Sequence, residues 1–452
     1  MKKRLVSLVA LLLCLLFALQ ATALAQTAPA EGEKIVLTFC NWGDGTEQKM
    51  FEDVFARYMA DHPNVEINYL YIPHGEYMTK LNTMAASGTM PDMGQMIEHS
   101  SLLWAENDMF LDVSDLYESG AIAPRMPAVT FSETENGYLG SSFIQEVVIL
   151  FYNKDYTEKM GVTVPTRVED AWTWDEFVAA AKQLTTDKNG KHPDEEGFDP
   201  ENIDVYGVAD VNPEIMAMSN GGGYFSPDGK EIWLDKPETI EAVQRVADLM
   251  NVYHVSPIPT TRDAIGGGNN PLMTQKVAMH FSGQFCLLWY GDFLKTGELN
   301  LGTGVLPKMK ELKTSNSGPA ITIFKNTKYP EVCKDLLTYF YTTENILDNI
   351  HMGLWMPSEE QWYTDEELKA KWVDESEIHP EEYKYGVIDM ARDCVVPNSF
   401  YVLGNTNEMN AIISAALDQV WLGEKTAEDV IVNEIMPELQ PIFDEYWEDR
   451  AE

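Results

Sequence analysis

Cysteine is scarce in this sequence of 452 residues, and its spacing matches no metal-binding or redox motif. None of the five cysteines belongs to a Cys-x-x-Cys pair, so a zinc or redox site of that kind is not expected. Cys14 lies within an apolar run and follows a leucine, which argues against a lipid anchor at this position. We interpret the other four, Cys40, Cys286, Cys333 and Cys394, as mostly buried small hydrophobic residues, although export would permit disulfides.

Positive charge is also in short supply. The sequence has 32 lysines and arginines against 72 aspartates and glutamates, which gives a formal net charge of −40. A surface of this sign repels nucleic acid and anionic membranes, so neither is an expected partner. The hydrophobic share of 45% and charged share of 23% are typical of a folded protein with a core of ordinary size.

Recognisable catalytic and cofactor motifs are missing. The glycine triplets at 221–223 and 266–268 lack the Lys-Ser/Thr of a phosphate loop, and there is no Gly-x-Ser-x-Gly sequence. The eight histidines show no metal-ligand spacing. The acidic stretch 185–204 lacks the full spacing of a calcium loop, so we favour a surface loop there and leave calcium binding open. We therefore predict a protein that is not an enzyme and that binds no cofactor or metal.

Only one long hydrophobic run is present, at residues 5–19. Three cationic residues precede it, and the Ala-Leu-Ala sequence at 23–25 supplies the small residues that a signal peptidase requires. The run is short for a membrane span, which needs about 20 residues. The pattern predicts a secretory signal peptide over 1–25, cleavage before Gln26, and a polar linker over 26–33.

Strand-like and helix-like segments alternate along the rest of the chain. Buried or alternating apolar runs predict strands at 34–40, 65–72, 147–152 and 276–281. Apolar residues at helical spacing predict helices at 46–58, 77–86, 174–184, 237–253 and 329–342, with a helical tail over 408–447. This order is typical of an α/β fold.

Aromatic residues are abundant, with 11 Trp, 20 Tyr and 18 Phe. Several follow predicted strands, where a ring can stack on the C–H face of a sugar while nearby polar groups bond its hydroxyls. For any single ring, packing in the core is the commoner role. We interpret Trp233 and Trp421 as packing residues.

A series of short motifs occurs in a distinctive order. It comprises Asn-Trp-Gly at 41–43, a Gly-x-x-Pro-Asp turn within 86–92, Tyr-Asn-Lys-Asp at 152–155, Thr-Trp-Asp-Glu-Phe at 173–177, and 276–283. In this order the chain resembles the extracellular solute-binding proteins of carbohydrate ABC transporters, the family that includes maltose-binding protein. Phe285 stands where tryptophan is common in that family.

The resemblance implies a two-lobed periplasmic-binding-protein-like fold of type II. One α/β lobe would comprise 34–140 plus 303–347, and the other 141–302 plus 348–452. The chain would cross between the lobes at hinge segments near 138–143, 299–305 and 345–355. Hinge closure over a ligand is the expected motion.

The resemblance also implies a function. The protein would be exported to the periplasm or the cell exterior, act as a monomer, and deliver a sugar or oligosaccharide to the permease subunits of an ABC transporter. The alternatives are a secreted glycoside hydrolase, which would use two carboxylates, and a glycan-binding surface protein without a transport role.

The candidate ligand-binding residues follow from the resemblance, position by position. They lie at strand ends, beside the first crossing, in a glycine turn, near the third crossing and before the tail helix. They are Trp42, Asp44, Glu98, His99, Glu146, Asn220, Gly221, Phe285, Trp289, Trp355 and Tyr401.

Overall fold

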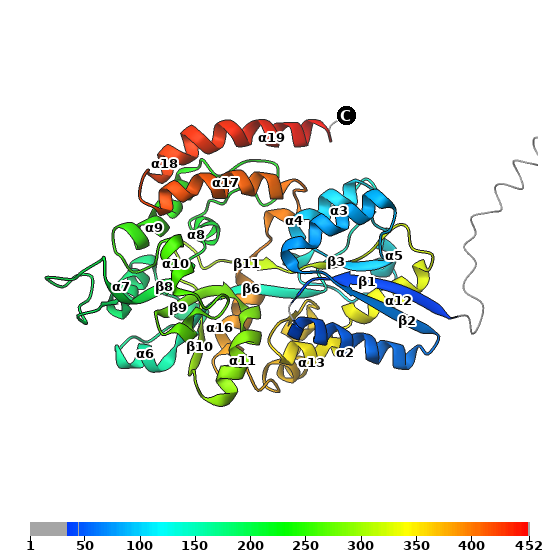
Figure 1. Ribbon diagram of the computed structural model, residues 1–452, viewed down its shortest axis with the longest axis horizontal. Helices are drawn as coiled ribbons and strands as arrows, with labels where there is room; N and C mark the ends of the chain where they lie inside the picture. Colours follow the sequence, from blue (N-terminus) through cyan, green and yellow to red (C-terminus); the bar gives the residue numbers. More distant parts are fainter. Residues whose placement is uncertain (1–33, 44, 451–452) are drawn as a thin grey trace, which may run out of the picture.

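The computed structural model describes residues 34–43 and 45–450 of the protein. The predicted signal peptide over 1–25, the linker over 26–33 and the candidate residue Asp44 lie outside the described residues. Two large β-sheets, each covered by helices on both faces, lie side by side (Figure 1). A small third sheet pairs β4 (Glu133–Thr134) with β5 (Gly137–Tyr138) in antiparallel fashion. The helices, in chain order, are α2 (Gly45–Asp61), α3 (Tyr77–Ser87), α4 (Glu98–Glu106), α5 (Ser114–Glu118), α6 (Lys154–Lys159), α7 (Trp174–Leu184), α8 (Pro213–Ser219), α9 (Pro237–Asn251), α10 (Pro259–Ile265), α11 (Leu287–Thr296), α12 (Pro330–Tyr341), α13 (Thr343–His351), α14 (Gln361–Thr364), α15 (Glu366–Val373), α16 (Tyr383–Asp389), α17 (Thr406–Trp421), α18 (Ala427–Val430) and α19 (Met436–Glu448).

The smaller sheet has the strand order β12-β3-β1-β2. Its strands are β1 (Ile35–Asn41), β2 (Val65–Tyr71), β3 (Met93–Met96) and β12 (Ala320–Ile323). β1 runs parallel to both β2 and β3, and β12 is antiparallel to β3. On one face Phe39 stacks on Phe340 of α12 and packs at a tilt against Phe51 of α2, while α3 and α4 pack against the other face.

The larger sheet has the order β14-β11-β6-β9-β8-β7, and β10 and β13 also pair with β6. Its strands are β6 (Ile144–Asn153), β7 (Thr186–Asp187), β8 (Ile203–Ala209), β9 (Val277–Gly283), β10 (Leu301–Gly304), β11 (Thr314–Ser317), β13 (Met356–Pro357) and β14 (Val395–Val396). The long apolar strand β6 crosses the middle of the molecule (Figure 1) and pairs with four other strands. The tail helices α17 to α19 form a separate apolar cluster with α9.

Side chains that cap helices explain why several elements begin where the sequence predicts. Helix α7 begins at Trp174 because the Thr173 hydroxyl and the Glu176 carboxylate cap each other's backbone N–H groups. Asn153 caps α6 through the backbone N–H of Tyr156. The four described cysteines are free thiols, and three of them are buried, which confirms their interpretation as small packing residues. Within 34–43 and 45–450, no helix is long and apolar enough to cross a membrane.

The acidic stretch that might have suggested calcium folds onto its own backbone. Asp187 accepts hydrogen bonds from the backbone N–H groups of Asn189, Lys191 and Asp199, at 2.8 to 3.0 Å. The carboxylate of Asp187 is thus hydrogen-bonded to the backbone of its own loop, as expected of a surface loop.

The chain passes between the sheets at positions that differ in part from the prediction. β10 pairs with β6 inside the larger sheet, with Leu301 opposite Asn153, so no crossing lies at 299–305. The chain instead leaves the larger sheet after Ser317 and enters the smaller sheet at Ala320. Gly318 lies between them, and a Cβ there would come within 2.4 Å of Ser142 Oγ. Residues 303–317 therefore belong with the larger sheet, because both β10 and β11 pair with β6. The sequence did not reveal this pairing, because it joins strands that are far apart along the chain.

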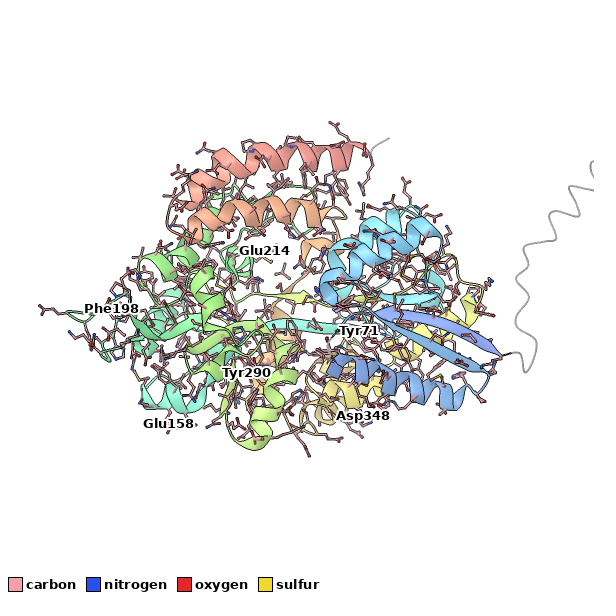
Figure 2. The ribbon with its side chains drawn as sticks, viewed as in Figure 1. Tyr71, Glu158, Phe198, Glu214, Tyr290 and Asp348 are labelled. Carbon is pink, nitrogen blue, oxygen red and sulfur yellow. The ribbon has the colours of Figure 1, made fainter. Side chains whose placement is uncertain are left out.

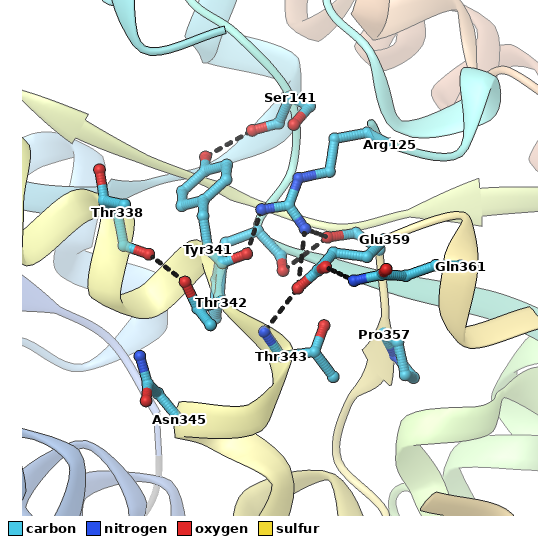
Figure 3. A network of polar contacts seen from close by, with 12 residues as sticks. Arg125, Ser141, Thr338, Tyr341, Thr342, Thr343, Asn345, Pro357, Glu359 and Gln361 are labelled. Carbon is cyan, nitrogen blue, oxygen red and sulfur yellow. Dashed lines mark hydrogen bonds and ion pairs between the residues drawn. The ribbon is translucent and has the colours of Figure 1, made fainter. Parts of the chain in front are cut away.

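A buried charged pair joins the crossing segments (Figure 3). Arg125 Nη1 lies 3.9 Å from Glu359 Oε1, and the two side chains are only 3% and 4% exposed. The guanidinium also donates to Ser358 Oγ at 3.1 Å and to the carbonyl of Tyr341. Glu359 in turn accepts the backbone N–H of Thr343 at 2.7 Å.

The same network satisfies backbone groups of the first crossing. Tyr341 Oη donates to the carbonyl of Ser141 at 2.5 Å, and Ser358 Oγ donates to the carbonyl of Phe143 at 2.7 Å. Met356 of β13 pairs with Gln145 of β6 immediately beyond. Segments near 125, 141–143, 341–343 and 356–359 are thereby held together at one place, where irregular backbone would otherwise be left without partners.

Breaking this pair should destabilise the fold strongly. Glu359→Gln leaves the Arg125 charge buried without its counter-ion, so we expect a loss of about 3–5 kcal/mol in unfolding free energy, measured by urea denaturation. Lys49→Ala is the control, because it removes an exposed pair with Asp53 and should cost less than about 1 kcal/mol. The double variant Arg125→Met/Glu359→Leu should recover part of the loss. Equal stability of Glu359→Gln and Lys49→Ala would contradict this role.

Candidate ligand-binding site

A cavity of about 580 Å³ lies where the two sheets meet, and residues from both sheets line it. Its size falls within the range of about 300–1,000 Å³ that is usual for small-molecule sites. The lining residues are Trp42, Gly43, Glu47, Phe51, His74, Gln95, Glu98, Glu146, Asn269, Phe285, Trp289, Ser317, Pro319, Leu354 and Trp355. Six of these are among the sequence-predicted site residues.

The smaller sheet contributes residues that follow the carboxyl ends of its parallel strands. Trp42 comes directly after β1, His74 follows β2, and Glu98 opens α4 just beyond β3. Parallel strands end at the same edge of a sheet, and ligands of α/β folds bind outside that edge. The local topology therefore explains why these three side chains converge.

The larger sheet places a carboxyl group and two aromatic rings opposite them. In the register of β6 and β9, Val148 lies opposite Gly283, which brings Glu146 near the turn that carries Phe285. The Phe285 ring folds back over Gly283, where a Cβ would lie only 2.0 Å from Phe285 Cε1. Glycine is required at position 283 by this close approach. Trp289 on α11 meets Phe285 edge-on at 6.1 Å.

Three aromatic side chains from different elements form much of the apolar wall. Trp42 is half-buried and packs edge-on against Tyr77, at 5.0 Å between ring centroids. Trp355 is only 2% exposed and sits mainly in the core, edge-on to Phe51 and Phe143. Trp42, Phe285 and Trp289 are thus the rings with faces available to a ligand, whereas Trp355 contributes only a small part of its surface.

Two carboxyl groups in the cavity have strongly perturbed acidity. Burial raises the pKa of Glu98 from 4.5 to about 7. Burial, followed by the charges of Glu98 and Glu47, raises the pKa of Glu146 well above its ordinary value. The Ser317 hydroxyl donates a hydrogen bond to Glu146 Oε2 at 3.5 Å. Both carboxyls can therefore hold a proton near neutral pH, and serve either as hydrogen-bond donors or as acceptors.

Four of the predicted residues that the structure describes, His99, Asn220, Gly221 and Tyr401, lie away from the cavity lining. His99 follows Glu98 on α4, and burial together with the charge of His74 lowers the pKa of His99. Asn220 is buried, and its amide donates to the Glu238 carbonyl at 2.8 Å and to Glu241 Oε2 at 3.1 Å. These bonds give Asn220 a structural role in tying α8 to α9.

Gly221 belongs to a second cavity of about 360 Å³ beside α8. Glu214, Tyr224 and Trp233 also line this cavity, and Glu214 is marked at the centre of Figure 2. Trp233 is partly exposed there and donates to Glu231, rather than packing in the core as the sequence suggested.

Tyr401 does not face the cleft as a stacking platform, which corrects its predicted placement. The side chain is fully buried and meets the ring of Phe131 edge-on at 4.4 Å. Its hydroxyl donates to the Gly318 carbonyl at 3.0 Å and accepts a hydrogen bond from Asn316. The chain returns to the core of the smaller sheet at 399–401, so an aromatic residue before the tail helix becomes a packing residue.

Several lining residues escaped sequence reasoning. His74 and Gln95 could have been found, because they lie at or after the ends of parallel strands. Asn269 follows the glycine triplet at 266–268, and nothing in that sequence placed it beside a cleft. Arg262 holds this loop through the carbonyls of Gly266 and Gly268, both at 3.0 Å.

Comparison with known proteins gives a consistent result. The sequence model of a family described as bacterial extracellular solute-binding protein matches residues 42–346. An ABC substrate-binding protein of Listeria monocytogenes in complex with cycloalternan is 20% identical, with 93% of this chain and 100% of that chain covered and a TM-score of 0.74.

Two further solved structures share the fold. The cyclic alpha-maltosyl-1,6-maltose binding protein of Arthrobacter globiformis is 18% identical, covers 90% of this chain and 99% of its own, and has a TM-score of 0.72. The maltose/maltodextrin-binding domain of Bdellovibrio bacteriovorus bound to maltotriose is 14% identical, with 90% and 100% covered and a TM-score of 0.65. The predicted two-lobed α/β fold is confirmed.

The raised pKa of Glu98 should leave a signature in stability. Between about pH 4.5 and 7 the folded Glu98 keeps a proton that the unfolded chain has lost, so unfolding free energy falls as pH rises through this window. Glu98→Gln lacks this penalty. Relative to the native protein, its Tm should gain about 1 °C, the shift expected for a ~1 kcal/mol change in a chain of this length, as pH rises to 7 and then stay level. The exposed Glu424→Gln should show no such trend, and parallel melting curves for Glu98→Gln would rule out the perturbed carboxyl.

Proposed function

Because this chain belongs to the bacterial extracellular solute-binding proteins, we propose that it captures a sugar or oligosaccharide between its two lobes and delivers it to an ABC transporter permease. The protein would work outside the cytoplasmic membrane, as a monomer and without catalysis. Binding between the lobes would draw them together, and the permease would recognise the closed form.

The observation that carries this proposal is the composition of the interlobe cavity. Its exposed ring faces come from Trp42, Phe285 and Trp289, and its polar groups include the carboxyls of Glu98 and Glu146. A sugar ring presents an apolar face and a rim of hydroxyls, and these two kinds of wall match the two parts of the ring. Residues of both sheets contribute, so a bound ring would touch both lobes.

The similar structures support the same class of ligand. Those of Listeria monocytogenes and Bdellovibrio bacteriovorus hold cycloalternan and maltotriose, respectively. This chain covers 100% of the length of each of those two chains, so the fold that holds the sugar in them is present in full here.

A glycoside hydrolase is the second candidate, because Glu98 and Glu146 are two carboxyls of raised pKa in a sugar-sized cavity. A hydrolase would use one as acid and the other as base or nucleophile. Incubation with glycans that bind, followed by chromatography of the products, separates the two functions. We expect the bound glycan to be recovered intact, and its cleavage, abolished in Glu146→Gln, would establish the hydrolase instead.

The role of Trp42 can be tested with a matched control. Trp42→Ala removes a ring face from the cavity, so we expect the affinity for the best glycan of an oligosaccharide panel to fall roughly ten-fold or more. Trp172→Ala removes a ring of similar partial exposure outside the cavity, and should leave affinity unchanged. Isothermal titration calorimetry gives both values. Equal affinities for the two variants would place the ligand elsewhere.

A further inference from the structure

The ionisable side chains that line the interlobe cavity are mostly acidic. Its ionisable lining residues are Glu47, Glu98, Glu146 and His74, and among the described residues no lysine or arginine lines it. Tyr401, under the cavity, feels the charges of both Glu98 and Glu146.

The aromatic wall of the cavity, like its carboxyl groups, favours a positively charged ligand. The face of an indole or phenyl ring carries partial negative charge and attracts an ammonium group placed over it. Trp42, Phe285 and Trp289 bring such rings to the cavity that holds the carboxyls. Carboxyl groups and ring faces are independent features, since one set could occur without the other, and both stabilise a cation.

We propose that the ligand is an amino sugar or an oligosaccharide containing one, whose protonated amino group binds next to Glu98 and Glu146. This inference rests on the proposed sugar-binding function and names the chemical class of its ligand. A uronic acid or a sulfated sugar would instead bring a negative charge into a cavity whose described lining residues include no lysine or arginine to bind it.

Binding of such a ligand should release protons. In the empty cavity burial favours the protonated carboxyls, with Glu98 near its midpoint at neutral pH. An ammonium group favours the ionised form, so the carboxyls lose protons to the buffer when it binds. The other titratable groups around the two carboxyls are Glu47 from α2, His74 before α3 and Tyr401, and none of these carries a fixed positive charge.

The test uses gluco- and galacto-configured sugars, as monomers and 1,4-linked trimers, each as the free amine, the N-acetylated form and the uronic acid. Titration calorimetry at pH 7 in two buffers of different ionisation enthalpy yields affinity and proton release together. We expect the best amine to bind roughly ten-fold tighter than its N-acetylated form, with proton release, and the uronate to bind most weakly. Only the amine should release protons.

Two variants assign the preference to its residues. In Glu98→Gln and Glu146→Gln the ratio of amine to N-acetyl affinity should fall toward one, whereas the exposed Glu424→Gln keeps the native ratio at the same net charge. Tighter binding of an N-acetylated or uronate form, or an unchanged ratio in both cavity variants, would overturn the amino-sugar inference and leave sugar binding intact. Failure of every probe to bind would count against the proposed function itself.

Discussion

The fold depends on the way its chain passes between two sheets without leaving buried backbone groups unpaired. Neither sheet continues through the crossing, so side chains have to supply the partners. Arg125, Tyr341 and the adjacent pair Ser358 and Glu359 do this from three separate segments, and the two opposite charges are buried. The crossing segments are thereby fixed as one unit.

That crossing also explains the position of the cavity. β6 and β11 lead from the crossing into the larger sheet, so Glu146 and Ser317 face the strand ends of the smaller sheet. Glu98 comes from the opposite lobe. Burial raises the pKa of its carboxyl, and the charge of Glu98 adds to the effect of burial in raising the pKa of Glu146. Two such carboxyls reduce the stability of the empty protein, a cost that a ligand with suitable donors or charge can remove.

Much of the fold could be predicted because its signals are local. The capping box at Thr173 and Glu176 placed the start of α7, and the apolar pattern placed β1, α2 and β2. The pairing of β10 with β6 could not be predicted, because it depends on residues almost 150 positions apart in sequence. Tyr401 shows the same limit at the site: a ring before a helix suits a cleft or a core equally well, and only the carbonyl of Gly318 and the ring of Phe131 decide for the core.

The central claim is that one ligand in the interlobe cavity holds the two lobes together. Small-angle X-ray scattering of the mature protein, with and without the tightest-binding glycan, measures this most directly. The account predicts a smaller radius of gyration at saturating ligand, since the lobes rotate about the Arg125–Glu359 crossing and close over the cavity. An unchanged radius with binding confirmed by calorimetry in the same sample would contradict it.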